Sequence, residues 1–466
     1  MAARHRFPSG TGRIPARGRH AALFALLGLM MVGVRAAPAA PQALLIVLGD
    51  QHSAYERTAQ LVARVDQLAR AHPDVPRAIL LNGDTQEYGN VIARRSQGAI
   101  DFALYEALAR RAPTIVNLGN HETEFHDLPE TVRRIEATGA KVVGNIRDRG
   151  TGRLAAPPAL PLALGPHAAV VAGITTDNLS TYRVALRPGL DLSDPVIWVR
   201  QQFPALLKGA VLPIVLSHAG IKADRGILPL LPEGTLLAGA HDHQRFVERF
   251  GRTVYFHSGS WQSHVSLAWL DVDEGGRHRW TVEQVALSAA DPADPEMKAV
   301  IARVLAEHLT PEDRAVIGRT GSALAPAEAG RFAAAALRRA AGVDAAFVGN
   351  TTFGAGLPAG TVSRLEFDAC VRFDGPVFET EVDGERLAQL LAAANLTPET
   401  PFAQRRGEFN FAAGPDAIDP ARVYRIATTD WGARNTDRYF GAPALRWREI
   451  PDLKLKAAVI SALDGS

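Results

Sequence analysis

The sequence predicts a layered α/β protein of two domains. Its 466 residues are enough for about two or three domains, and 47% hydrophobic with 21% charged residues is a globular composition. Short, mostly apolar runs alternate with helical patterns from residue 42 to about 290, and a similar pattern runs from about 328 to 466. Apolar runs that alternate with helices predict buried strands with helices packed against the sheets.

Residues 1–39 have the composition of an export signal. Arginines come first without any acid, the apolar run Ala21–Val34 follows, and Ala37-Pro38-Ala39 comes last, which is the order of a secretory signal peptide. We expect cleavage after Ala39, because this run is short for a membrane span of about 20 residues. The alternative is an uncleaved N-terminal anchor. Cleavage predicts a periplasmic or secreted protein without a stable membrane span.

Charge and cysteine content exclude several classes of function. The formal net charge is +2 for the whole chain and −4 without residues 1–39, because that segment carries six arginines and no acid. The basic pI therefore gives no evidence for binding a nucleic-acid polymer. Cys370 is the only cysteine, which excludes an internal disulfide, a thiolate metal cluster and a dithiol redox centre.

The first domain, residues 42–290, contains seven apolar runs that predict strands and three patterns that predict helices. The strands are expected at Ala43–Leu48, Ala78–Leu81, Thr114–Leu118, Ala168–Ala172, Pro213–Leu216, Thr235–Ala238 and Thr253–Phe256. The helices are expected at Tyr55–Ala71, Ser96–Arg111 and Leu128–Thr138. A further strand, Val265–Val272, is expected to lead out of the domain.

A connector and a second, smaller α/β domain follow. Residues 291–327 predict a helix and then a linker, because a charged helical pattern passes into a stretch punctuated by proline and glycine. Residues 328–466 predict the second domain. Its pattern is a helix at 329–342, a strand at 345–350, a strand, tight turn and helix at 378–395, and a strand at 422–431.

Five predicted strands of the first domain end on side chains that can bind metals. In chain order these are Asp50 and His52, Asp84, Asn120 and His121, His218, and His241 and His243. Ligands of open α/β sheets bind beyond the carboxyl ends of the strands, and these side chains form a nitrogen and oxygen set. Eight ligands are too many for one ion. Two ions that share Asp84 would use seven and leave His121 over, and such pairs are suited to phosphoester hydrolysis.

These five ordered blocks resemble the calcineurin-like metallophosphoesterases over about residues 42–290. The blocks are Asp50-x-His52, Gly83-Asp84, Gly119-Asn120-His121-Glu122, His218, and Ala240-His241-Asp242-His243, the last of which has Ala240 where the family usually has glycine. The resemblance implies two divalent ions, of Mn, Zn or Fe. It implies that Asp50, His52, Asp84 and His243 hold one ion, and that Asp84, Asn120, His218 and His241 hold the other.

The same resemblance implies a catalytic role for His121. This histidine would contact the phosphoryl group and help the leaving oxygen depart, without binding a metal. In nucleotidase-like members an aspartate three residues further on orients this histidine. Glu124 stands at that position here, and Asp127 is the alternative partner.

The complete arrangement resembles the secreted 5′-nucleotidases, which include UDP-sugar hydrolases and 2′,3′-cyclic phosphodiesterases. The stretches that carry the resemblance are 348–362, 377–391 and 407–414. It implies that Asn120 and Asn350 contact substrate and that Phe409 stacks on the base. Two departures affect this site. The Gly-Gly and arginine that usually follow Asn350 are absent, and 435–441 replaces the second aromatic loop, with Tyr439 as the substitute. Trp261 and Trp431 are expected to be either cleft walls or core.

The expected function is that of an exported dinuclear-metal phosphohydrolase in nucleotide catabolism. A metal-bound hydroxide would attack the phosphorus of a small-molecule phosphoester, expected to be a nucleotide. One alternative is a phosphatase or phosphodiesterase for a non-nucleotide substrate, which the altered loop at Asn350 favours. Others are a non-catalytic binding protein of the same fold and a sulfur-oxidation hydrolase of related fold. Binding alone does not require His121, which argues against the non-catalytic alternative.

Overall fold

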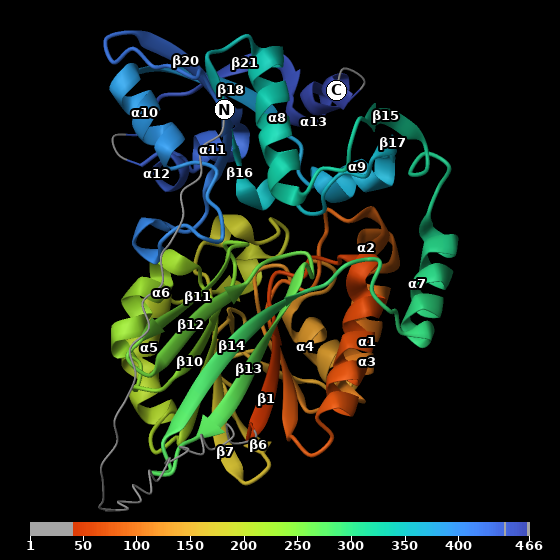
Figure 1. Ribbon diagram of the computed structural model, residues 1–466, viewed down its shortest axis with the longest axis vertical. Helices are drawn as coiled ribbons and strands as arrows, with labels where there is room; N and C mark the ends of the chain where they lie inside the picture. The colour runs from red at the N-terminus through yellow and green to blue at the C-terminus, as the bar shows by residue number, and fades with distance from the viewer. Residues whose placement is uncertain (1–40, 442–443, 464–466) are drawn as a thin grey trace, which may run out of the picture. The chain divides into compact units, whose positions relative to one another are not determined.

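The structure is a computed structural model that describes residues 41–441 and 444–463 (Figure 1). The predicted signal peptide, residues 1–39, lies outside these residues. Within the described residues, no helix combines the length and the apolar character that crossing a membrane requires.

The first domain contains two six-stranded sheets. In spatial order, the strands of the first sheet are β14 (His278–Ala286), β13 (His264–Val272), β1 (Ala43–Leu48), β2 (Arg77–Asn82), β3 (Thr114–Asn117) and β4 (Lys141–Val143). Those of the second are β11 (Arg245–Phe250), β12 (Thr253–Ser258), β10 (Leu236–Gly239), β9 (Leu212–His218), β7 (His167–Thr175) and β6 (Ala159–Leu164). The predicted apolar runs form all of these strands except β4, β6, β11 and β14. Strands β1 to β4 are parallel to one another, as are β7, β9, β10 and β12, so their carboxyl ends lie together in each sheet.

Alternating side chains divide the core of this domain into layers. Leu44 and Ile46 of β1 face the helices α1 (Tyr55–Ala71), α3 (Ala99–Ala109) and α4 (Leu128–Ala137), whereas Leu45 and Val47 face the second sheet. Successive side chains of a strand point to opposite faces, so each strand contributes to two layers. Helices α5 (Pro195–Leu206) and α6 (Ile221–Ile227) pack on the other face of the second sheet. The order of layers is helix, sheet, sheet, helix.

Two buried asparagines join the carboxyl ends of the two sheets. Asn82 ends β2, and its Nδ2 donates to carbonyls of β9 and β10 at 3.1 and 2.8 Å. Asn117 ends β3, and its Nδ2 donates to carbonyls of β7 and β9 at 2.9 and 3.1 Å. Both side chains are almost fully buried, where polar groups are normally hydrogen-bonded. These bonds fix the strand ends of one sheet against those of the other.

The second domain is built on a five-stranded sheet. Its spatial order is β19 (Asn410–Ala413), β16 (Ala345–Gly349), β20 (Val423–Thr429), β18 (Pro376–Asp383) and β21 (Arg448–Lys454). Its helices are α8 (Pro326–Ala341), α9 (Arg364–Cys370), α10 (Gly384–Ala392), α11 (Asp430–Arg434), α12 (Thr436–Tyr439) and α13 (Leu455–Leu463). Helix α7 (Pro295–His308) connects the two domains. A short pair, β5 (Arg147–Asp148) with β8 (Leu190–Asp191), completes the strands of the first domain.

Most predicted elements are confirmed, and β1 and α1 have the predicted bounds. The helix predicted at Ser96–Arg111 is confirmed as α3, but it begins three residues later than predicted, and the short helix before it was not predicted. The chain forms α2 (Val91–Ser96) and α3, separated by Gln97 and Gly98, whose left-handed φ values of 55° and 78° end α2. The expected linker also differs, because Val316–Thr320 forms β15 and pairs with β17 (Gly360–Ser363).

Candidate active site

The side chains predicted at the five strand ends converge in the structure. They follow β1, β2, β3, β9 and β10, whose carboxyl ends lie together. Several of them have left-handed backbone conformations that non-glycine residues rarely adopt. These are Asp50 (φ 52°), His52 (50°), Asp84 (54°), His241 (83°) and His243 (56°). Such strain clusters at functional sites, where the surrounding structure holds it. Here the left-handed conformations occur where the chain leaves the strands, at residues whose side chains lie close to one another.

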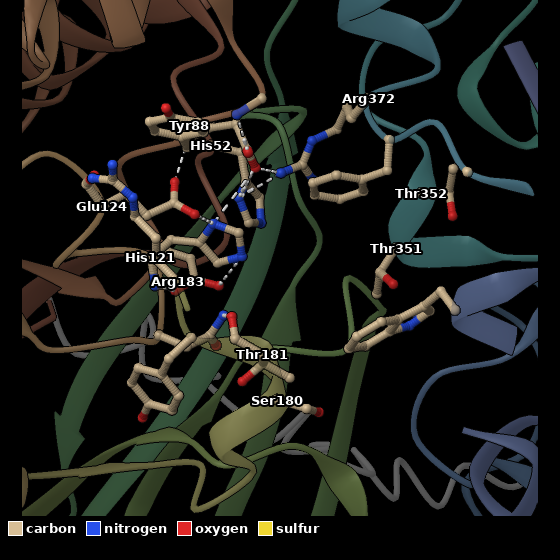
Figure 2. Close-up of a pocket in the computed structure, with 18 of the residues that line it drawn as sticks. His52, Tyr88, His121, Glu124, Ser180, Thr181, Arg183, Thr351, Thr352 and Arg372 are labelled. Carbon is tan, nitrogen blue, oxygen red and sulfur yellow. Dashed lines mark hydrogen bonds and ion pairs between the residues drawn. The ribbon is translucent and has the colours of Figure 1, made fainter. Parts of the chain in front are cut away.

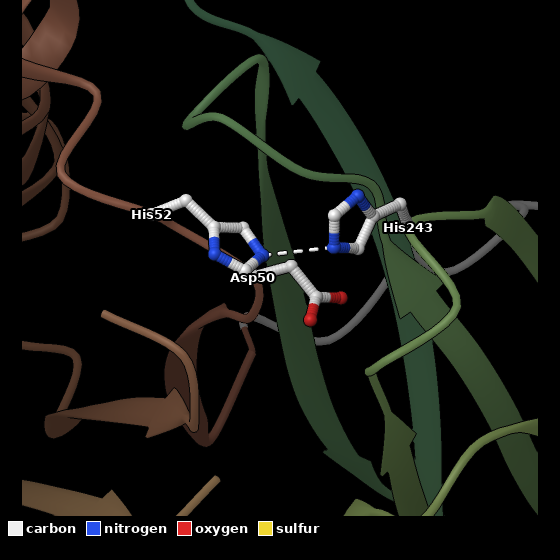
Figure 3. A group of neighbouring side chains, drawn as sticks. All are labelled: Asp50, His52 and His243. Atoms are coloured by element: carbon white, nitrogen blue, oxygen red, sulfur yellow. Dashed lines mark hydrogen bonds between the residues drawn. The ribbon is translucent and has the colours of Figure 1, made fainter. Parts of the chain in front are cut away.

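The first group consists of Asp50, His52 and His243, and Figure 3 shows their side chains turned toward one another. The Nε2 atoms of the two histidines lie 2.8 Å apart. Asp50 is buried, and both of its oxygens accept from the backbone N–H of His241, at 2.9 and 3.0 Å. One aspartate and two histidines form the borderline ligand set that suits Zn, Mn or Fe.

The second group consists of Asp84, His218 and His241. His218 Nε2 lies 3.0 Å from Asp84 Oδ2 and 3.8 Å from Asp50 Oδ1. Its other ring nitrogen, Nδ1, lies 2.7 Å from the backbone oxygen of Asn82. Because a carbonyl only accepts, Nδ1 carries the proton, and Nε2 is free to bind a cation. Asp84 also adjoins the first group, because its backbone oxygen accepts from the backbone N–H of His52 at 2.8 Å.

The donor atoms fit a pair of divalent cations. Asn120 Oδ1, His218 Nε2 and His241 Nε2 are buried without a hydrogen-bond partner, and buried polar atoms normally have one. Burial, with a smaller contribution from the neighbouring Asp84, raises the pKa of the Asp50 carboxyl to about 8 against the opposing effect of His218. A cation between the groups would favour the ionised carboxylates, and the three unpartnered atoms could coordinate it.

His121 lies beside the second group, and Glu124 is its partner. Its Nδ1 is 2.9 Å from Glu124 Oε1, and its Nε2 is 3.9 Å from Asp84 Oδ2. Burial lowers the pKa of His121, but Glu124 and then Asp84 outweigh this and raise it to about 10. The other oxygen of Glu124 accepts from the backbone N–H of Tyr88. Asp127, the alternative partner, instead caps α4 by accepting from Glu130 N at 2.9 Å.

A cavity of about 460 Å³ opens onto these side chains, and both domains line it (Figure 2). The first domain contributes His52, Asp84, Asn120, His121, His241 and His243. The second contributes Thr351, Thr352, Arg372, Phe373 and Trp431 among others. Tyr88 and Tyr182 add further rings, and Arg94, Arg183 and Arg187 add cationic groups. The cavity therefore has metal-binding groups on one side and aromatic and cationic walls on the others.

Three residues predicted to contact substrate from the second domain lie elsewhere. Asn350 joins the domains, because its Nδ2 donates to the backbone oxygen of Asp242 and its Oδ1 accepts from Phe409 N, both at 2.9 Å. Phe409 packs edge-on against Phe411 at 5.2 Å, and with Asn350 it lines a separate cavity of about 180 Å³. Tyr439 is buried, with its hydroxyl 3.1 Å from Trp431 Nε1. None of the three lines the large cavity.

Most residues of the cavity wall in the second domain were missed in the sequence, among them Arg372 and Phe373. These two come two and three residues after the end of α9, and Phe373 is 43% exposed. Their only sequence signal is a charged and an aromatic residue, followed by Asp374 and Gly375, between a helix and a strand. Trp431 lines the same cavity, whereas Trp261 is buried, and its ring stacks on His52 at a centroid distance of 6.1 Å.

Two family models match the chain. Residues 43–258 match the calcineurin-like phosphoesterases, and residues 306–443 match the 5′-nucleotidase C-terminal domain. The chain is a hydrolase of the 5′-nucleotidase family of metallophosphoesterases. This bears out the family and the two-domain α/β fold that the sequence motifs imply. The paired Asp and His groups also agree with the dinuclear metal binding of calcineurin-like enzymes.

Solved structures share the fold over nearly the whole chain. A 5′-nucleotidase precursor from Thermus thermophilus is 16% identical, with a TM-score of 0.61 and coverage of 91% of this chain and 96% of that chain. The sulfate thiohydrolase SoxB of Thermus thermophilus is also 16% identical, with a TM-score of 0.64 and coverage of 92% and 95%. The Candida albicans 5′-nucleotidase is 11% identical, with a TM-score of 0.58 and coverage of 91% and 98%. No curated protein sequence matches the chain significantly.

We predict that His121→Asn leaves both metals bound and lowers kcat by about 10²- to 10⁴-fold, the usual contribution of a positioned acid or base. Metal content per chain and steady-state kinetics measure the two effects. His126→Asn is a matched control, because His126 lies in the same loop, packs on Phe102 at 6.0 Å and does not line the large cavity. Loss of a metal from the His121 variant would place His121 among the ligands.

Proposed function

We propose that this chain is an exported phosphohydrolase that uses two divalent metal ions and acts on nucleotides. The observation that carries the proposal is the cavity shared by the two domains. Its volume of about 460 Å³ lies within the range of small-molecule sites, about 300–1,000 Å³. One wall has the metal-binding groups and His121, and another has aromatic rings. This arrangement suits a substrate with a phosphoryl group at one end and a planar ring at the other.

The residues of the chain have distinct tasks in this reaction. When bound, two divalent ions would activate water and neutralise the charge that develops on the phosphoryl oxygens. Asp50, His52, Asp84 and His243 would hold one ion, and Asp84, Asn120, His218 and His241 the other. His121 would hold a proton at Nε2 near the departing oxygen, and Glu124 would fix its ring through Nδ1, 2.9 Å away.

We assign the base-binding surface to Phe373 and Trp431 in place of Phe409. Phe373 and Trp431 line the cavity that contains His121, whereas Phe409 lines the smaller one. Phe373 is also 43% exposed, so part of its ring is available for stacking although Arg372 packs over it at 4.9 Å. Exposed aromatic rings that line a cavity bind planar ligands by stacking. The stacked ligand also removes the apolar surface of the ring from water, which is favourable.

One observation favours a second candidate function, the hydrolysis of a non-nucleotide phosphoester. Asn350, Phe409 and Tyr439, which the resemblance assigned to nucleotide binding, all lie outside the large cavity. The similar SoxB structure is named a sulfate thiohydrolase, so this fold also occurs in an enzyme with a different substrate class. The two candidates differ in whether the ring wall of the cavity contributes to substrate affinity.

We predict that Phe373→Ala raises KM for a nucleoside monophosphate by about 5- to 150-fold. This range corresponds to the loss of one base-stacking contact of about 1–3 kcal/mol. KM for a small alkyl phosphate without a ring should stay nearly unchanged, because that substrate does not reach the ring. Phe409→Ala is the matched control, and we expect it to leave both KM values unchanged.

Three other results would change these assignments. Equal effects of Phe373→Ala on both substrates would mean that Phe373 only supports the fold. A larger effect from Phe409→Ala would restore the original assignment of the base to Phe409. A wild-type protein that hydrolyses alkyl phosphates and no nucleotide would favour the second candidate.

Export is proposed from residues 1–39 alone. Sequencing the N-terminus of the protein isolated from cells that export it tests this, and we expect Ala40 as the first residue. An intact N-terminus on soluble protein would contradict both cleavage and export by this segment.

A further inference from the structure

Arg372 of the second domain reaches a predicted metal ligand of the first. It lies two residues after the end of α9, is 4% exposed, and its Nη2 is 3.1 Å from His52 Nδ1. It also forms an ion pair with Glu87, whose side chain is buried to the same degree. The guanidinium packs against the rings of Trp261 and Phe373, each at 4.9 Å. Figure 2 shows Arg372 extending toward His52 from the opposite wall of the cavity.

The tautomer of His52 decides what each neighbour does. His52 Nε2 faces His243 Nε2 at 2.8 Å, so a shared cation requires an unprotonated Nε2 and places the proton on Nδ1. A guanidinium has only donors, so the 3.1 Å contact of Arg372 with Nδ1 is a hydrogen bond only in the other tautomer, in which Nδ1 is unprotonated. Glu87 Oε2 is 3.2 Å from Nδ1 and is an acceptor. Glu87 is therefore the partner that keeps His52 in its metal-binding tautomer.

We propose that Glu87 is a positioning residue for His52 and that the second domain tunes the affinity of this metal position through Arg372. The inference rests on the dinuclear site of the proposed function. One carboxylate would serve two partners, because it accepts from His52 Nδ1–H and pairs with Arg372. Neither Glu87 nor Arg372 belongs to the ligand set that the sequence motifs imply.

The two partners of Glu87 act on the metal in opposite directions. A carboxylate that accepts from a ligating histidine fixes the ring and raises its basicity, which strengthens metal binding. A guanidinium near the same histidine repels a divalent cation and shares the carboxylate, which weakens metal binding. Arg372 nevertheless stabilises the apo site, because a buried carboxylate without a cationic partner is costly. Metal binding and docking of Arg372 are therefore coupled, and the coupling is reciprocal.

Titration of metal-free full-length protein with Mn²⁺ tests the inference. We expect Glu87→Gln to weaken binding at one of the two positions by about 10- to 100-fold, the usual effect of losing such a partner. We expect Arg372→Gln to tighten binding at that position by about 3- to 10-fold, because a nearby positive charge is removed. Arg225→Gln is the matched control. Arg225 also crosses to the second domain, where it donates to the backbone oxygens of Phe402 and Arg405, and its loss should leave both affinities unchanged.

Opposite changes in Mn²⁺ affinity for the two variants would distinguish this proposal from a purely structural role of Glu87 and Arg372. Equal weakening by Glu87→Gln and Arg372→Gln, or no change with Glu87→Gln, would overturn the inference. Wild-type protein that binds fewer than two ions would instead overturn the dinuclear assignment on which the inference rests.

Hydrogen exchange gives a second readout that does not depend on the glutamate variant. The backbone N–H of Arg372 donates to the backbone oxygen of Thr352 at 3.0 Å. By reciprocity, Mn²⁺ should increase exchange at Arg372 in the wild-type protein. Metal-induced protection there would contradict the inference.

Discussion

The geometry of the site depends on one buried carboxylate, that of Glu122, which accepts three backbone N–H groups. One oxygen accepts from Gly119 and Asp84 at 2.7 and 2.8 Å, and the other accepts from Thr85 at 2.7 Å. These donors belong to the segments that follow β2 and β3, so the bonds hold both strand ends in one position. Asp84 can then adopt its left-handed conformation, with its carboxylate 3.0 Å from His218 Nε2. Gly119 is required here, because a Cβ at that position would lie 2.3 Å from Asp84 Oδ1.

Further contacts connect the ends of β2 and β3 to the second sheet and to the second domain. Asn82 and Asn117 bind carbonyls of β7, β9 and β10, so the histidines that follow β9 and β10 face the residues that follow β1 to β3. The second domain closes the cavity from the other side, and Asn350 binds the segment that carries His241 and His243 through the Asp242 carbonyl at 2.9 Å. Arg372 then brings a cation next to His52. Each half of the cavity is therefore incomplete without contacts from the other.

Sequence reasoning predicted the part of the candidate site that local patterns determine. Strand ends can be predicted from the sequence because apolar runs stop abruptly at polar residues. Strands β1 and β3 begin where predicted. The cavity walls in the second domain depend on pairing between distant segments, which composition does not show. Antiparallel pairing of β16 with β19 sets Phe409 against Asn350 and turns its ring toward Phe411. Phe373 instead enters the large cavity because α9 ends beside it. The break at Gln97 was missed for a related reason, since glutamine rarely adopts a left-handed conformation.

Anomalous X-ray scattering from crystals of the protein grown with Mn²⁺ or Zn²⁺ tests the central claim most directly. The account predicts two peaks about 3.5–4 Å apart, the usual spacing of a dinuclear site, with the Asp84 carboxylate touching both. One ion should also contact Asp50, His52 and His243, and the other Asn120, His218 and His241. A single peak, or an ion held by His121 and Glu124, would contradict the account.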